Sequence, residues 1–149
     1  FLSRDLLKMK LDIVFNGKFS DFKKLKHLTT RRNKTEIYTN LPNLSDLMSK
    51  ADLAIGASGS TSWERCCMGL PTIAVISAEN QKFIAKLLNL KGAAIVLQSS
   101  LFSVSKISKT VISLYNDESF YLRMSKKAYS ICDGNGSKRV AKHMMRNLR

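Results

Sequence analysis

The fold of this chain is decided by a stretch in its middle third, Asp52-Leu53-Ala54-Ile55-Gly56-Ala57-Ser58-Gly59-Ser60-Thr61-Ser62-Trp63-Glu64. Its first five residues form a mostly apolar run, which favours a buried β-strand. The residues that follow are small and turn-forming, and a helical pattern begins at about Thr61. A strand that passes through a glycine-containing turn into a helix is the repeating unit of parallel α/β sheets, so we expect a fold of this class.

Outside this stretch, short apolar runs alternate with helical periodicity along the rest of the chain. Strands are predicted over residues 11–15, 35–39, 71–76 and 93–97, with helices between them. Gly69 and Gly92 are expected to end two of these helices. The last third is helical, with apolar stripes over residues 104–114, 120–131 and 140–148. The pattern predicts one domain over residues 1–149, a Rossmann-like parallel sheet with helices on both faces.

The turn after the central strand has the composition of a phosphate-binding loop. Gly56 and Gly59 let the backbone approach a ligand without a Cβ clash. Unpaired N–H groups at the start of the next helix point toward the same place. Hydroxyl groups that can donate hydrogen bonds come from Ser58, Ser60, Thr61 and Ser62.

Glu64 has two interpretations that spacing alone leaves open. The run Thr61-Ser62-Trp63-Glu64 fits a capping box, in which the Glu64 side chain hydrogen-bonds back to the start of the helix. Alternatively, a carboxylate one turn into the helix accepts hydrogen bonds from both hydroxyls of a ribose, as acidic residues do in dinucleotide-binding folds.

Four sequence blocks together resemble a known family. They are residues 52–66, Gly69-Leu70-Pro71, Glu79-Asn80-Gln81 and residues 132–140. Their order is that of the carboxyl-terminal lobe of the UDP-sugar hydrolases of pseudaminic acid biosynthesis and of the related spore-coat polysaccharide proteins. The pattern is more distantly similar to that of GT-B glycosyltransferases such as the lipid II-forming N-acetylglucosaminyltransferase.

The resemblance implies the carboxyl-terminal lobe of a GT-B-like fold, in which a UDP-sugar is bound between two lobes. The residues it assigns to the substrate are Ser58, Gly59, Ser60 and Thr61 at the phosphates, Glu64 at the ribose, and Glu79, Asn80 and Gln81 at the sugar. Without the family, Asn80 is a candidate N-cap for the following helix. Trp63 is expected to pack beneath the loop rather than to stack on uracil.

The chain departs from the family in two ways. In the family, a histidine in a Gly-rich loop of the amino-terminal lobe is the general base. This chain contains only His27 and His143, both predicted on helices away from the strand ends, so we expect no catalytic residue in it. The first strand of the lobe and its Gly-Gly-Ser-Asp loop are also absent, and the chain is expected to be a fragment without the amino-terminal lobe.

Three functions therefore remain open. The first is the UDP-sugar-binding lobe of a hydrolase that releases UDP from a diacetamido-trideoxyhexose in surface-glycan synthesis, working with an amino-terminal lobe. The second is the donor-binding lobe of a GT-B glycosyltransferase, in which an acceptor hydroxyl replaces water. The third is a non-catalytic nucleotide-binding subunit.

The net charge of +14 suggests an anionic partner, but its distribution argues against nucleic acid. Residues 51–100, which hold the unusual motifs, carry 4 Lys/Arg against 3 Asp/Glu, whereas residues 101–149 carry 10 against 3. A nucleic-acid protein concentrates charge and aromatic residues where it binds. The leading interpretation is solvated helix faces, and the alternatives are docking of an acidic lobe or peripheral contact with membrane phosphates.

The three cysteines do not suggest a disulfide framework, because Cys66 and Cys67 are adjacent. Free thiols in a cytoplasmic protein are the better interpretation. The sequence offers neither C-x-x-C spacing nor paired carboxylates for a metal, so we expect no metal and no cofactor. No stretch approaches the ~20 apolar residues that a membrane-spanning helix needs.

Overall fold

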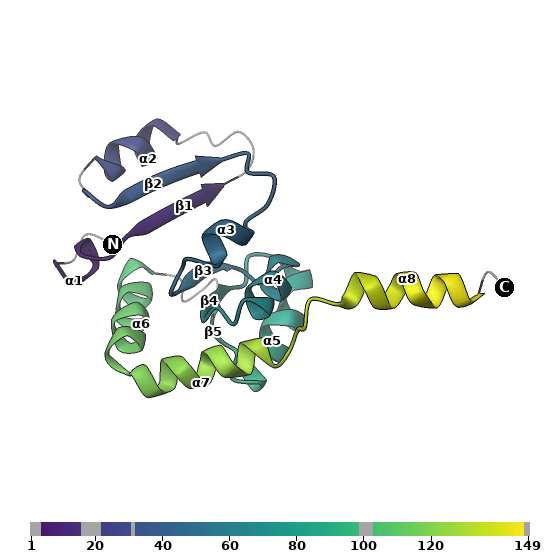
Figure 1. Ribbon diagram of the computed structural model, residues 1–149. Helices are drawn as coiled ribbons and strands as arrows, with labels where there is room; N and C mark the ends of the chain where they lie inside the picture. The colour runs from purple at the N-terminus through teal and green to yellow at the C-terminus, as the bar shows by residue number, and fades with distance from the viewer. Residues whose placement is uncertain (1–3, 16–21, 31, 99–102, 148–149) are drawn as a thin grey trace.

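Strands and helices alternate along the chain in the computed structural model, which describes residues 4–15, 22–30, 32–98 and 103–147 (Figure 1). The elements are α1 (Arg4–Leu7), β1 (Leu11–Phe15), α2 (Phe22–Thr29), β2 (Thr35–Thr39), α3 (Ser45–Met48), β3 (Ala54–Ala57), α4 (Thr61–Cys67), β4 (Thr72–Val75), η1 (Glu79–Gln81), α5 (Lys82–Leu90), β5 (Ala94–Leu97), α6 (Val104–Asn116), α7 (Glu118–Tyr129) and α8 (Gly136–Asn147). The five predicted strands are all present, and their ends agree with the predicted ones to within two residues.

All of these strands pair in parallel, as expected for an α/β fold, but they form two sheets instead of one. β1 pairs with β2, with Leu11 opposite Thr35. β4 lies between β3 and β5 in a three-stranded sheet. The usual doubly wound order is 3-2-1-4-5-6. The described strands form the orders β1-β2 and β3-β4-β5, in two separate sheets.

The core has two halves because successive residues of a strand point to opposite faces of the sheet. On β4, Ile73 belongs to one buried cluster and Ala74 to the other. The first cluster joins α1, β5, α6 and α7 through Leu6, Leu97, Ile107, Val111, Leu114 and Met124. The second joins α4, α5, the start of β5 and α7 through Cys66, Leu88, Ala93, Ala94 and Ala128. Helices therefore cover both faces of the sheet, as predicted.

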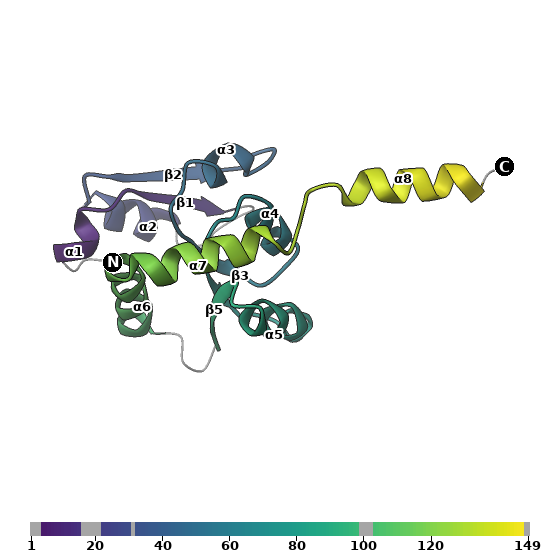
Figure 2. The same cartoon turned by 60° about the horizontal axis from the view of Figure 1, so that its bottom comes forward.

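The helical tail packs only in part. Ile107, Val111 and Leu114 of the α6 stripe are buried, but Val104 is 70% exposed. α8 extends away from the rest of the molecule in both views (Figures 1 and 2), and Val140 and Met144 on its stripe are each 60% exposed. Leu148, the last residue of that stripe, lies outside the described residues. Nowhere in the described ranges is a helix long and apolar enough to cross a membrane.

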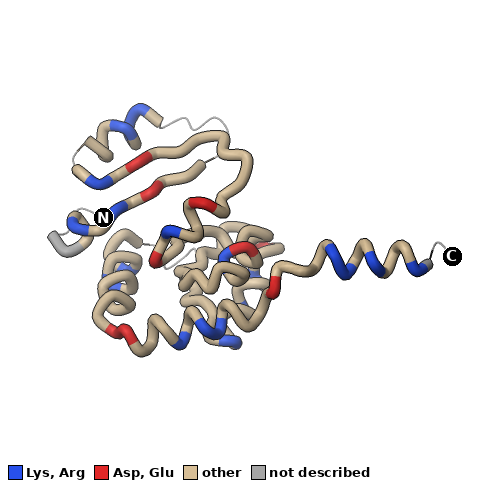
Figure 3. Tube along the Cα trace, viewed as in Figure 1, with Lys and Arg blue, Asp and Glu red and all other residues tan. Residues whose placement is uncertain are grey.

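Many of the basic residues lie on exposed helix surfaces, whereas Arg32 and Arg65 are buried. Lys and Arg recur along α2, α7 and α8 (Figure 3). Lys23, Lys24, Lys126 and Lys127 are all exposed. The strands around the glycine-containing loop carry little of this charge.

Candidate functional site

The loop after β3 is anchored to β4 through Ser58. The Ser58 N–H donates to the carbonyl of Val75 at 3.1 Å, and its hydroxyl lies 3.4 Å from the same oxygen. The Ser58 side chain is fully buried. The predicted phosphate contact of Ser58 is therefore not supported, because this hydroxyl faces β4 and already has an acceptor.

Gly59, Ser60 and Thr61 form the outward part of the loop. The carbonyls of Gly59 and Ser60 accept hydrogen bonds from the N–H groups of Ser62 and Trp63, each at 3.0 Å. The N–H groups of residues 59–61 find no acceptor among the described residues. A Cβ added at Gly59 would meet no atom within 4 Å. The loop thus presents three backbone donors beside open space, which suits an anion.

The capping box, one of the two interpretations of Glu64, does not form in the structure. α4 begins at Thr61, so its N-cap is Ser60, and no side chain caps the helix. In a capping box the Glu64 carboxylate would bond back to the Thr61 N–H, but this N–H has no acceptor among the described residues. Glu64 is exposed, and its carboxylate has no hydrogen bond or ion pair among the described residues. It is available to a ligand.

Arg65 is a buried cation under the loop that the sequence analysis did not identify. It is only 5% exposed. Its Nη2 donates to the carbonyl of Ala57 at 2.6 Å and to the hydroxyl of Ser62 at 3.0 Å. Burial lowers the pKa of its guanidinium, against the opposing effect of Cys66 and Glu64. Within the described part of the chain its Nε has no hydrogen-bond partner and its charge has no carboxylate at salt-bridge distance.

Gly56 creates the space for this guanidinium. A Cβ at position 56 would lie 2.5 Å from Nη1 of Arg65. The sequence analysis assigned this space to a ligand, whereas in the structure the Arg65 side chain occupies it. Trp63 is half-buried against the core cluster on the α4 side of the sheet, which agrees with its predicted packing role.

Glu79, Asn80 and Gln81 form the 3₁₀ turn η1 after β4. Asn80 does not cap α5, since the N-cap position is Gln81. The Gln81 Oε1 accepts from both the N–H and the hydroxyl of Ser77, each at 3.0 Å, so it stabilises its own turn. Glu79 is exposed and pairs with Lys82 at 2.8 Å. Glu79 and Asn80 therefore remain the accessible candidates here.

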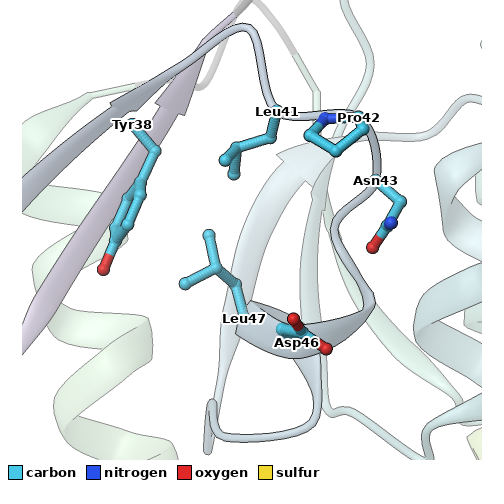
Figure 4. A pocket seen from close by; sticks show the side chains of 6 residues that line it. All are labelled: Tyr38, Leu41, Pro42, Asn43, Asp46 and Leu47. Atoms are coloured by element: carbon cyan, nitrogen blue, oxygen red, sulfur yellow. The ribbon is translucent and has the colours of Figure 1, made fainter.

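A hollow of about 300 Å³ lies beyond the carboxyl end of β2, between this strand and α3 (Figure 4). Tyr38, Leu41 and Leu47 supply its apolar wall, and Pro42, Asn43 and Asp46 complete it. The sequence analysis did not single out these residues. The available signal was their position at and just after the end of β2, because ligands in doubly wound folds bind outside the carboxyl ends of the strands.

The two histidines lie where they were predicted, on helices. His27 is exposed on α2 and His143 is exposed on α8. Neither belongs to the loops that follow β3 and β4.

A sequence profile of the glycosyltransferase family 28 C-terminal domain matches residues 8–144, which is nearly the whole chain. The chain belongs to this family. The family 28 domain is also similar in structure to MurG of Acinetobacter baumannii, with a TM-score of 0.75 at 20% identity over 93% of this chain and 42% of that chain. The glycotransferase of kitacinnamycin gives a TM-score of 0.67 at 15% identity over 97% of this chain and 44% of that chain. At these identities the likeness establishes the fold.

An uncharacterized protein of Methanocaldococcus jannaschii is 31% identical to the family 28 domain over 84 residues, which are 54% of this chain and 17% of that protein. The chain thus spans less than half of the two solved structures and a small part of this relative. The glycosyltransferase interpretation of the sequence fits these findings better than the hydrolase interpretation. The narrower resemblance to the UDP-sugar hydrolases is not confirmed.

Proposed function

We propose that this family 28 domain is the donor-binding lobe of a two-lobed glycosyltransferase and binds a UDP-sugar. The observation that carries the proposal is the family match over residues 8–144. Two further facts support it. The similar solved structures include enzymes described as glycosyl- or forosaminyltransferases, and each is more than twice as long as the part that this chain matches. An amino-terminal lobe is the proposed partner.

The diphosphate is proposed to lie on Gly59, Ser60 and Thr61. Their N–H groups are unpaired among the described residues, and the buried charge of Arg65 lies directly below. In glycosyl transfer the bond from the anomeric carbon to the diphosphate oxygen breaks while the acceptor oxygen bonds to that carbon. Negative charge then grows on the departing UDP, and donors already fixed in place stabilise it without reorganisation.

The remaining parts of the donor are proposed to bind residues at or after the ends of β2, β3 and β4. Glu64 is proposed to bind the ribose, since its side chain is exposed and makes no capping hydrogen bond. The hollow lined by Tyr38, Leu41 and Leu47 suits a flat base, because apolar and aromatic walls are typical of small-molecule sites. Glu79 and Asn80 are proposed to face the sugar.

The hydrolase alternative uses the same lobe with water in place of the acceptor hydroxyl. Its narrower substrate, a UDP-linked diacetamido-trideoxyhexose, is carried only by the sequence resemblance. Product analysis on the two-lobed protein separates these functions: a hydrolase yields free sugar, whereas a transferase yields a glycoside only when an acceptor is present.

Calorimetric titration with UDP tests the proposed site through Glu64→Ala. A carboxylate that accepts hydroxyl hydrogen bonds contributes roughly 1.5–3 kcal/mol, so the variant should bind UDP about ten- to a hundred-fold more weakly. The melting temperature should hardly change, because Glu64 makes no capping bond that the substitution could remove.

Glu118→Ala is the matched control, since Glu118 is also an exposed glutamate in the first turn of a helix. It should leave UDP affinity unchanged. Equal affinities in wild type and in Glu64→Ala would remove Glu64 from the site, and the absence of any UDP binding by wild type would overturn the proposed function.

A further inference from the structure

Two cysteine sulfurs from distant parts of the chain lie side by side. The Sγ atoms of Cys67 and Cys132 are 3.1 Å apart, with the Cys67 thiol donating toward Cys132. Cys67 is the last residue of α4, and Cys132 lies just beyond the end of α7. Since the sulfurs of a disulfide are about 2.05 Å apart, about 1 Å of closure separates this pair from a covalent bond.

Direct contacts hold the two helix ends together. The Ser125 hydroxyl of α7 donates to the carbonyl of Gly69, just after α4, at 2.7 Å. A Cβ added at Gly69 would lie 3.4 Å from the Cβ of Tyr129. α4 and α7 also contact each other along their packed faces. The proximity of the sulfurs is therefore a property of the packed core and not of two mobile loops.

The third cysteine is arranged differently. Cys66 is 3% exposed within the core, and burial raises the pKa of its thiol to about 11. Cys67 and Cys132 are both partly exposed. Adjacent residues of a helix point about 100° apart because 3.6 residues make one turn. Cys66 thus faces the core while its neighbour faces Cys132, and only the thiolate form reacts readily with oxidants.

We propose that Cys67 and Cys132 are a modification site at which a hydroperoxide forms a reversible intramolecular disulfide, with Cys66 left as a thiol. One thiolate attacks the peroxide oxygen, which gives a sulfenic acid and releases an alcohol or water. The second thiolate then attacks the sulfenic sulfur and displaces its oxygen as water. In total, two thiols and one hydroperoxide become one disulfide, one alcohol or water, and one further water.

The surroundings predict the pH dependence of this oxidation. The hydrogen bond to Cys132 raises the pKa of the Cys67 thiol, burial and the Asp133 carboxylate add to this, and only the Gly134 backbone opposes it. Asp133 itself is paired with Arg139 at 2.6 Å. Little of the Cys67 thiolate is therefore present at pH 7, so the disulfide should form several-fold faster at pH 9.

The test is oxidation of the reduced chain with hydrogen peroxide, followed by intact mass measurement and thiol counting under denaturing conditions. The expected product is monomeric, has lost two hydrogen atoms, and retains one of the three thiols. Cys66→Ser should still form the bond, whereas Cys67→Ser and Cys132→Ser should not. Reduction with dithiothreitol should reverse it.

The melting temperature provides a second measurement. Closing the long loop between positions 67 and 132 should raise it upon oxidation in wild type and in Cys66→Ser. Cys132→Ser should show no such rise. A bond that persists in Cys67→Ser, oxidation that stops at sulfinic acids, or products that are only intermolecular dimers would each overturn the proposal.

Discussion

The burial of Arg65 could not be predicted from its place in the sequence. In the sequence it follows Glu64 in a short helix and resembles the solvated charges elsewhere in the chain. In the structure it is buried and supports the carbonyl of Ala57 and the hydroxyl of Ser62. The available signal was Gly56, since a glycine inside a strand marks a place where another group approaches closely.

The choice of residues proposed to bind the phosphates also depends on which side chains are buried and which are exposed. Gly59, Ser60 and Thr61 could be selected from composition, because small residues before a helix leave backbone donors unpaired. Composition could not separate them from Ser58 and Ser62, whose hydroxyls face inward. Which hydroxyl of a serine-rich loop faces solvent depends on the alternation along β3 and on the tertiary partner below.

Arg65→Met tests the buried charge directly. For an assumed separation of about 8 Å between the Arg65 guanidinium and one charge on the ligand, and an effective dielectric constant of about 20, the attraction is about 2 kcal/mol. UDP should therefore bind roughly thirty-fold more weakly to the variant. Uridine, which has no phosphate, should bind almost as well as it does to wild type. Titration of both ligands makes the comparison.

Two controls separate charge from folding in that experiment. Lys126→Met removes one exposed positive charge of α7 and should leave UDP affinity within a factor of two. Arg65→Lys keeps the charge and should retain part of the affinity. If Arg65→Met weakens UDP and uridine equally, Arg65 supports the loop without acting on the phosphates.

At the scale of elements, periodicity predicted the strands well because each is a short apolar run between turn signals. Gly69 and Gly92, with φ angles of 60° and 67°, end α4 and α5 as expected. Helix starts were predicted less well. A capping pattern requires the cap residue to be assigned without error. The sequence favoured Thr61 and Asn80 as N-caps, but the tight turns before α4 and α5 place the N-caps at Ser60 and Gln81.

A substitution in the wall of the hollow beside α3 tests whether the base binds there. Leu47→Asp places a charge in the apolar wall formed by β2 and α3, so both UDP and uridine should bind at least ten-fold more weakly. Leu90→Asp is the control, since Leu90 is 73% exposed on α5 and away from the hollow. Equal loss of affinity in both variants, or no loss in either, would place the base elsewhere.

At the scale of the whole molecule, this chain alone should bind UDP but should not turn over a UDP-sugar. The loop, α4 and the hollow are all built from residues 38–67, so the chain alone should bind UDP. A general base contributes 10²–10⁴-fold, and neither histidine lies beside the loops after β3 and β4. Incubation of the isolated chain with a UDP-sugar should therefore release no appreciable UDP, and addition of an amino-terminal lobe should restore turnover.

Rapid UDP release by the isolated chain, persisting in a His27→Ala, His143→Ala double variant, would mean that the chain holds its own catalytic group. Glu79 would then be the first residue to test, because it is an exposed carboxylate that follows β4.

The division of the strands into two sheets has a consequence for how copies of this protein behave in solution. In the described part of the chain, β1, β2, β3 and β5 each have one side that pairs with no other strand. Such a side is a row of N–H and C=O groups able to recruit a strand from another molecule. The charge of +14 keeps copies apart at low ionic strength. At 0.1 M salt, the repulsion between charges more than about 10 Å apart is largely screened, whereas backbone hydrogen bonds between strands are unaffected. Self-association should therefore increase as salt is added. Contacts driven by opposite charges would instead weaken.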